Sequence, residues 1–375
     1  MKTLQYHAEH RHATWLELFF DLVFVASIGV VTHNLAHTHH GHIELQQLWM
    51  FPIEFLPVWW IWATHTLYAN RFDTDSKAHR VASLGIMFLM VTMAAFLGEG
   101  IFDHYERFIG FYVAIRFVLA GLYLSSAGKL EDSRHYATRV GKGIIAGALI
   151  SGSSLLFDSP YREIILIGGI AFEMIAATIV GRKTSVDPIH KEHLVERIGL
   201  FSIILLGESI ISLVGGLRDI VWNPYNLTAA LTGFLMIGSL WWIYYDSFHV
   251  MEKLKRMKQG FVLVYSHIFL AMGLVILANV IRHAILGDLA MDDFRILAIT
   301  GMIFFYLGKQ IIYYVSIPSF RKNILINSTV CVAITVASGF LPRPEYALIG
   351  ITLGMFFYTY SNFKWTLTKD VTCPL

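Results

Sequence analysis

The sequence predicts an all-α membrane protein of about twelve transmembrane helices, arranged as two tandem six-helix repeats with both termini in the cytoplasm. Three observations predict it: an apolar composition, a series of long apolar runs, and an uneven distribution of basic residues. Of the 375 residues, 55% are hydrophobic and 15% are charged, whereas soluble domains average about 45–50% apolar and about 25% charged residues. So few charges cannot cover a water-exposed surface, and lipid must therefore cover much of it.

Twelve apolar stretches come close to the length of about 20 residues that a membrane-spanning helix needs. In residues 1–183 they lie near Thr14–Leu35, Leu48–Ala69, Val81–Ile101, Phe108–Ala127, Val140–Leu156 and Glu163–Val180. In residues 184–375 they lie near Ile198–Leu217, Leu227–Val250, Phe261–Ile281, Phe294–Tyr313, Ile324–Leu341 and Tyr346–Phe363. The fifth stretch is short and rich in glycine, which disfavours a helix.

The basic residues give the orientation. If the chain starts in the cytoplasm, the even-numbered connections and both tails lie on the cytoplasmic side. These segments hold 20 of the 29 Lys and Arg residues, and the opposite connections hold six. Cytoplasmic connections are enriched in Lys and Arg in just this way. The sequence therefore predicts a multi-pass protein of the cell inner (plasma) membrane with both ends inside.

Two local matches suggest an internal repeat. His12–Phe20 aligns with His193–Phe201, and Trp59–Ile61 aligns with Trp241–Ile243 at nearly the same offset. Both matches fall at equivalent points of the two halves, so a duplicated six-helix unit is expected, with parallel copies related by an axis along the membrane normal. The alternative is coincidence in an aromatic-rich chain. The aromatic residues of Trp59–Trp62 are interpreted as packing and interfacial belt residues.

The first apolar run contains two carboxylates. Glu17 and Asp21 are four residues apart and so share a helix face. An ionisable side chain within the bilayer costs about 2.5–3.5 kcal/mol, and such groups usually pair, face water or act in function. The two carboxylates therefore invite a cation or a proton. The alternative is that both lie at the interface, where they cap the helix or pair with arginines of the connections.

The seventh run adds Arg197 at its inner boundary and Glu208 eleven residues further on, about 16 Å along a helix. Because this separation prevents direct pairing, Glu208 needs a partner on another helix. Arg116, in the middle of the fourth run, is the expected partner, and Glu99 and Glu173 compete for it. A role in conduction or coupling stands beside the alternative of a buried ion pair that only fixes helix packing.

Histidines suggest two further interpretations. A cluster in the first outward-facing connection either captures metal or forms a solvated run; it consists of His33, His37, His39, His40 and His42. A second set lies within or near the apolar runs, namely His65, His249, His267 and His283. Two facing histidines can hold haem, but the spacing pairs none of these four.

Motifs of known chemistry are absent from the sequence. There is no Gly-x-x-x-x-Gly-Lys-Ser/Thr for a nucleotide-driven pump. There is no His-Glu-x-x-His and no Gly-x-Ser-x-Gly for hydrolysis. The protein is therefore not expected to be an enzyme, and no cofactor is expected.

Two segments carry a family resemblance. Ala13–Val25 and His193–Glu208 resemble the corresponding motifs of the bacterial low-temperature-requirement A (LtrA) family. The likeness extends over nearly the whole chain in the number and spacing of helices. The family is linked to growth in the cold, so the resemblance implies a membrane protein without naming a substrate.

The leading hypothesis is a channel or secondary transporter for a small ion or solute. Its ion-coupling candidates are Glu17, Asp21, Arg116, Glu173, Arg197 and Glu208. The alternatives are an intramembrane haem or metal redox protein and a non-catalytic membrane factor of cold or stress adaptation. The expected partners are the lipid bilayer and the small ion or solute, with a homo-oligomer as an option and no nucleic acid.

Overall fold

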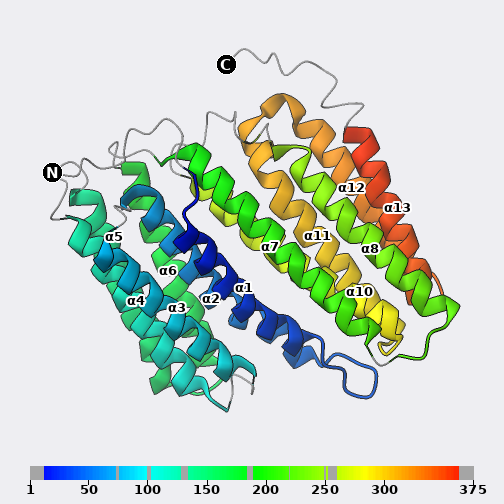
Figure 1. Cartoon of the computed structure of the whole chain (residues 1–375), viewed down its shortest axis with the longest axis horizontal. Helices are drawn as coiled ribbons and strands as arrows, with labels where there is room; N and C mark the ends of the chain where they lie inside the picture. Colours follow the sequence, from blue (N-terminus) through cyan, green and yellow to red (C-terminus); the bar gives the residue numbers. More distant parts are fainter. Residues whose placement is uncertain are drawn as a thin grey trace. The chain divides into compact units, whose positions relative to one another are not determined.

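The structure is a computed structural model that describes residues 12–72, 76–98, 103–127, 134–183, 189–218, 220–248, 251 and 260–362. Within these ranges the chain is all-α, and each of the twelve predicted spans coincides with one long helix (Figure 1). The first six are α1 (Trp15–Leu35), α2 (Leu45–Phe72), α3 (Lys77–Gly98), α4 (Tyr105–Ala127), α5 (Arg134–Ser153) and α6 (Tyr161–Lys183). The others are α7 (Lys191–Leu217), α8 (Pro224–Tyr245), α10 (Phe261–Leu286), α11 (Met291–Ser316), α12 (Arg321–Gly339) and α13 (Pro344–Asn362).

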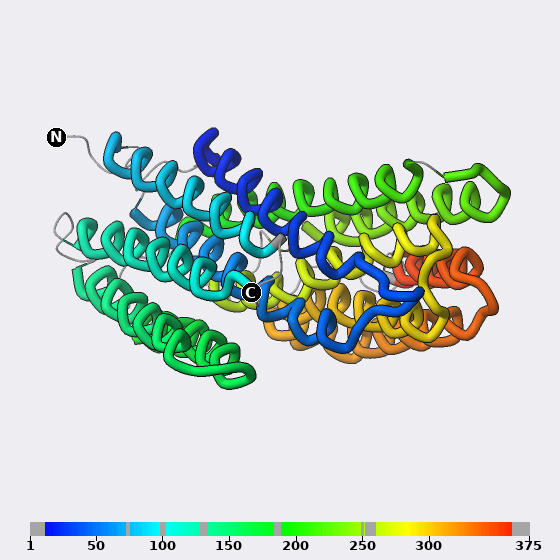
Figure 2. The backbone as a smooth tube through the Cα atoms, turned by 90° about the horizontal axis from the view of Figure 1, so that it is seen from below, coloured from blue at the N-terminus to red at the C-terminus, as the bar shows by residue number. Residues whose placement is uncertain are grey.

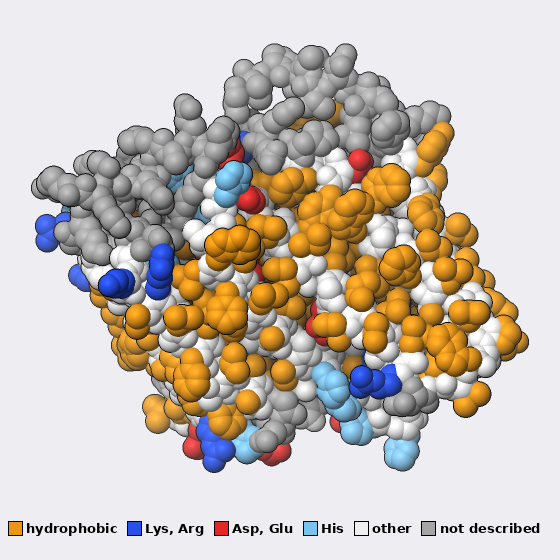
Figure 3. Space-filling view, viewed as in Figure 1, with side chains coloured by type: hydrophobic (Ala, Val, Ile, Leu, Met, Phe, Trp, Pro, Cys, Tyr) orange, Lys and Arg blue, Asp and Glu red, His pale blue; other side chains and the backbone are white. Residues whose placement is uncertain are grey.

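The helices are suited to a bilayer. Nine of those in the described ranges are long and apolar enough to cross a membrane. Large hydrophobic side chains such as Ile175 on α6 and Leu231 on α8 are more than half exposed, and Figure 3 shows hydrophobic side chains covering one face of the molecule. Such surface is stable only against lipid, so the chain is a multi-span membrane protein.

Packing divides the chain into two compact units. Unit 1 takes its described residues from Met1–Asn34, Trp49–Leu200 and Lys258–Phe261, and unit 2 from Leu35–Leu48, Phe201–Met257 and Val262–Leu375. α7 contributes its N-terminal part to unit 1 and the remainder to unit 2. Because a packing unit is not a sequence repeat, the predicted repeats 1–183 and 184–375 stay a prediction.

Within unit 1, neighbouring helices along the chain pack side by side: α3 against α4, α4 against α5, and α5 against α6. The same run can be followed from cyan to green in Figure 2. Glycines bring α5 and α6 close together, since a Cβ atom on Gly169 would lie 2.2 Å from Ser151 Oγ and 2.8 Å from the Gly147 carbonyl oxygen. Gly147 of α5 acts in the same way, since a Cβ atom there would lie 2.1 Å from Glu173 Cγ, so a glycine that weakens the fifth run as a helix allows its close packing.

Within unit 2, α12 packs against both α11 and α13, and α13 packs against α8. Glycines again allow close contact. A Cβ atom on Gly308 of α11 would lie 2.2 Å from the backbone nitrogen of Leu270 on α10, and one on Gly273 of α10 would lie 2.5 Å from that of Phe305. The backbones of α10 and α11 thus approach to a distance that a larger residue would prevent.

Candidate functional site

A buried arginine joins α7 to α1. The Arg197 guanidinium lies 2.9 Å from Glu17 Oε1 through Nη1 and 2.6 Å from Asp21 Oδ1 through Nη2. All three residues are fully buried. The spacing of four residues places both carboxylates on one face of α1, as the sequence predicts. The alternative is confirmed in one part, because Glu17 caps the start of α1 by accepting from the Thr14 backbone nitrogen. Its other part is wrong, because the arginine partner is Arg197 of α7 and not an arginine of the connections.

Glu17 is also held by neutral groups. The backbone nitrogen and the hydroxyl of Thr14 donate to Glu17 Oε2 at 2.8 and 3.0 Å, and His193 Nε2 lies 3.2 Å from the same oxygen. Asn70 fixes the state of this imidazole. Its amide is oriented by the backbone of His190, which accepts from Nδ2 and donates to Oδ1, so Nδ2 also points a proton at His193 Nδ1, 2.9 Å away. This pattern assigns the imidazole proton to Nε2, which donates to Glu17.

Asp21 is held from α2. Trp62 Nε1 donates to Asp21 Oδ1 at 2.7 Å, and Arg197 Nη2 donates to Thr66 Oγ1 at 3.4 Å. Together with Asn70, these α2 residues are spaced by four and line one face of the helix. The other Asp21 oxygen, Oδ2, is buried without a hydrogen-bond partner among the described residues. We call Glu17, Asp21, His193 and Arg197 the Arg197 cluster.

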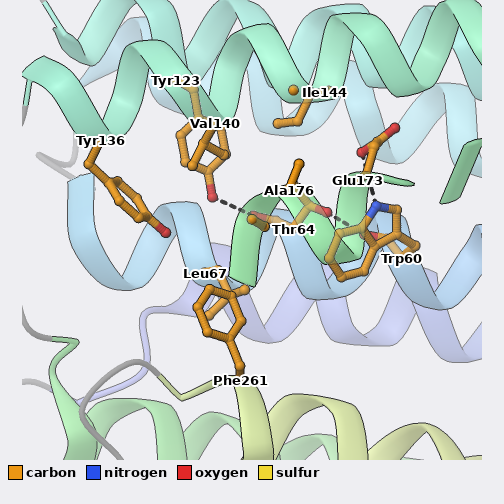
Figure 4. Close-up of a pocket in the computed structure, with 12 residues that line it drawn as sticks. Trp60, Thr64, Leu67, Tyr123, Tyr136, Val140, Ile144, Glu173, Ala176 and Phe261 are labelled. Carbon is orange, nitrogen blue, oxygen red and sulfur yellow. Dashed lines mark hydrogen bonds between the residues drawn. The ribbon is translucent and has the colours of Figure 1, made fainter. Parts of the chain in front are cut away.

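A second buried pair joins α4 to α6. Arg116 forms an ion pair with Glu173, and both side chains are almost fully buried. Trp60 Nε1 donates to Glu173 Oε2 at 2.9 Å, and Arg116 Nη1 donates to Thr64 Oγ1 at 3.1 Å. Figure 4 shows the indole nitrogen of Trp60 facing the Glu173 carboxylate. Of the competing partners predicted for Arg116, the structure selects Glu173.

Pairing of Arg116 with Glu208 is therefore wrong as a prediction. α4 and α6 both pack against α5, and this brings Arg116 and Glu173 together. Hydropathy does not indicate which helices pack, so it could not identify the partner. Glu208 is 8% exposed and has no ion pair or hydrogen bond within the described part of the chain. Glu99, the other competitor, lies outside the described residues.

A small cavity adjoins the Arg116–Glu173 pair. Its volume is about 20 Å³, close to the space that one water molecule needs. Figure 4 shows its lining, with Trp60 and Glu173 on one side and Tyr123 and Tyr136 on another. The Tyr123 hydroxyl donates to the Thr64 carbonyl oxygen at 3.3 Å.

The histidines of the first connection are held locally. His39 and His42 exchange two backbone hydrogen bonds of 2.8 and 3.0 Å, and His42 Nδ1 lies 2.9 Å from Asp293 Oδ2. In the described ranges, no group of three or more His, Cys, Asp or Glu side chains is placed to hold a metal ion.

The histidines within the helices also have local partners. His65 stacks on Phe20 and lies 3.0 Å from Ser83 Oγ. His267 lies 3.0 Å from the Tyr244 hydroxyl, and His283 lies 2.7 Å from Asp288. The fourth, His249, is outside the described residues.

Sequence reasoning missed the α2 side of the site and the role of His193. The prediction that Trp60 and Trp62 serve as packing and belt residues is incomplete, because each donates to a buried carboxylate. The spacing of Trp62, Thr66 and Asn70 by four residues is the signal that could have identified this face. α7 also begins at Lys191 rather than near Ile198, and carboxylates of α1 contact two of the polar residues that lower the hydropathy of its first turns, His193 and Arg197.

The long apolar helices of the described ranges, with charged side chains buried and paired among them, define the class, a multi-span membrane protein. A sequence model of the family described as bacterial low temperature requirement A protein (LtrA) matches residues 12–357. The chain belongs to this family, which confirms the resemblance of its first and seventh helices.

A curated relative extends the comparison. The uncharacterized protein RA0937 of Rhizobium meliloti (strain 1021) is 24% identical over 249 residues, which are 64% of this chain and 59% of the relative. The match thus spans about three fifths of the length of that relative.

Replacing Arg197 tests the cluster. Arg197→Gln leaves two carboxylates buried beside a neutral group, and loss of one partner of a buried ion pair costs about 3–5 kcal/mol. We expect a clearly lower melting temperature in detergent. Adding Asp21→Asn should restore part of the loss, because it removes one of the stranded charges.

The matched control is Arg218→Gln, at the exposed residue that directly follows α7. It should leave the melting temperature nearly unchanged. Equal losses for the Arg197 and Arg218 variants would contradict the cluster as a buried charge network.

Gly147 tests the second pair. A Cβ atom there would lie 2.1 Å from Glu173 Cγ, so Gly147→Ala should displace Glu173 from Arg116 and Trp60 and lower the melting temperature. In the same helix, Gly143→Ala meets only an ordinary contact of 3.6 Å with Ala176. A Gly143 variant as unstable as the Gly147 variant would show that the close packing at Glu173 is not the cause.

Proposed function

We propose that this LtrA-family protein is a channel or secondary transporter for a small ion or solute, with the Arg197 cluster as its site of proton or cation coupling. The observation that carries the proposal is the unequal number of negative and positive charges in the cluster. Two carboxylates, Glu17 and Asp21, share one guanidinium, and the histidine beside them has the hydrogen-bond pattern of a neutral imidazole.

The energetics favour uptake of a positive charge. Carboxylates that share a site inside a low-dielectric interior repel each other, and a bound proton or cation removes that repulsion. Asp21 Oδ2 is the atom that binds the proton or cation, since this buried oxygen accepts no hydrogen bond from the described residues. Intramembrane carboxylates with such an open acceptor are typical of ion and proton pathways.

The two buried arginines take different roles in this proposal. Arg116 and Glu173 form a one-to-one pair with satisfied neighbours, and such a balanced pair serves to position α4, α6 and α2. Glu208 is a second coupling candidate, because it is buried in α7 without a partner among the described side chains.

The proposal includes the topology. Both termini lie in the cytoplasm, the membrane is the inner membrane, and residues 1–183 and 184–375 form parallel six-helix repeats. The excess of basic residues in alternate connections and the two sequence matches support this arrangement. The protein acts without catalytic turnover of a covalent bond.

Reconstitution into liposomes tests the function. With a pH-sensitive dye inside, an imposed pH gradient should collapse faster in liposomes that contain the protein than in protein-free ones. Asp21→Asn removes the open acceptor and should return the rate to that of protein-free liposomes, and Glu208→Gln tests the second candidate in the same way.

The control is Glu106→Gln, which neutralises an exposed carboxylate at the start of α4 and should keep the wild-type rate. If the wild-type protein moves neither protons nor any alkali or alkaline-earth cation under an imposed gradient, the proposal is wrong. An Asp21→Asn variant with the wild-type rate would remove the cluster from it.

A further inference from the structure

Another buried carboxyl group lies at the other end of the α1–α2 pair. Glu54 of α2 is 6% exposed, and its Oε2 accepts from Asn34 Nδ2 of α1 at 3.2 Å. Asn34 Nδ2 also donates to the Leu97 carbonyl oxygen of α3 at 2.9 Å. The group that α1 presents to Glu54 is thus neutral, and no Lys, Arg or His of the described residues forms an ion pair with Glu54.

The helix around Glu54 is unusual. α2 contains Pro52 and Pro57, one on each side of this residue. Proline lacks the backbone N–H group, so each removes one hydrogen bond of the helical ladder. α2 nevertheless stays helical from Leu45 to Phe72, so the ladder is weakened beside Glu54 without being broken.

Aromatic side chains separate Glu54 from the Arg197 cluster. Phe24, Phe55, Trp59 and Trp62 are fully buried. The Trp59 ring centroid lies 6.1 Å from that of Phe55, 5.1 Å from that of Trp62 and 6.3 Å from that of Phe24. Trp62 is eight residues beyond Glu54, about 12 Å along the helix, and its indole donates to Asp21. We call these four residues the aromatic plug.

We propose that Glu54 is a second proton-binding carboxyl, which carries its proton in the resting protein and exchanges it from the side of the aromatic plug opposite to Asp21. A buried carboxyl beside only neutral donors is stable in its neutral form. The Asn34 amide fits this form, because it donates to an oxygen that acts as the carbonyl of the acid. With Asp21 on one side and Glu54 on the other, the plug closes the route between two proton sites.

The exchange requires no other chemistry. A proton leaves the Glu54 hydroxyl oxygen for water or another acceptor that reaches it, and the carboxylate regains a proton in the reverse step. The direction of coupling rests on the proposed transport function, but the protonation of Glu54 does not, and the two are tested separately.

Infrared spectroscopy of the purified full-length protein tests the protonation. Near neutral pH, the wild-type spectrum should contain a carbonyl band of a buried protonated carboxyl that Glu54→Gln removes. Glu54→Asp, which keeps a carboxyl, should retain such a band, and the exposed-site control Glu106→Gln should leave it unchanged. Because Glu208 can contribute a band to both spectra, the decisive quantity is the difference between the wild-type and Glu54→Gln spectra. A difference spectrum without a protonated-carboxyl band overturns the inference.

Proton flux in liposomes tests the exchange. Glu54→Gln resembles the neutral acid in shape, so we expect an unchanged melting temperature together with loss of the flux. Trp59→Ala, which opens the aromatic plug, should accelerate the collapse of the pH gradient. If Glu54→Gln retains the wild-type proton flux, Glu54 does not lie on the proton path. If the infrared band depends on Glu54 while the wild-type protein carries no flux, the transport proposal fails and the proton site stands.

Discussion

A guanidinium buried between two carboxylates is the interaction that holds the polar ends of α1 and α7 together. Arg197 cannot lie in this position without Glu17 and Asp21, because an isolated charge inside a helical bundle costs several kcal/mol. The same requirement explains why α7 begins before its apolar run. Residues that hydropathy alone places in a connection become helical, because their partners are inside unit 1.

α2 supplies further hydrogen-bonding side chains to the Arg197 cluster. From Val58 to Phe72 every residue of this helix is buried, so its surroundings are protein and it can carry polar side chains that lipid would exclude. Its residues at intervals of four donate to or accept from the Arg197 cluster, and Trp60 and Thr64 do the same for Arg116 and Glu173. One helix thus supports both charged sites and also carries the buried carboxyl of Glu54.

The two buried charged sites differ in charge balance. This difference distinguishes a pair that only fixes helix packing from the site that we propose to be functional. Arg116 and Glu173 neutralise each other, and Gly147 leaves just enough room for the Glu173 side chain. The Arg197 cluster retains a second carboxylate and an open acceptor oxygen on Asp21. A balanced pair fixes a packing arrangement, whereas an unbalanced one can change its state when a proton or cation arrives.

The sequence by itself determined the helices, because burial in lipid imposes a length and an apolar composition that are local properties of the chain. It also determined that Glu17 and Asp21 share a face, since the helical period is local. It did not determine the partners. Arg116 pairs with Glu173 rather than Glu208, and the tryptophans of α2 serve carboxylates rather than only packing. Those choices depend on which helices become neighbours, and only the tertiary structure decides this, because side-chain contacts between distant segments follow from packing geometry.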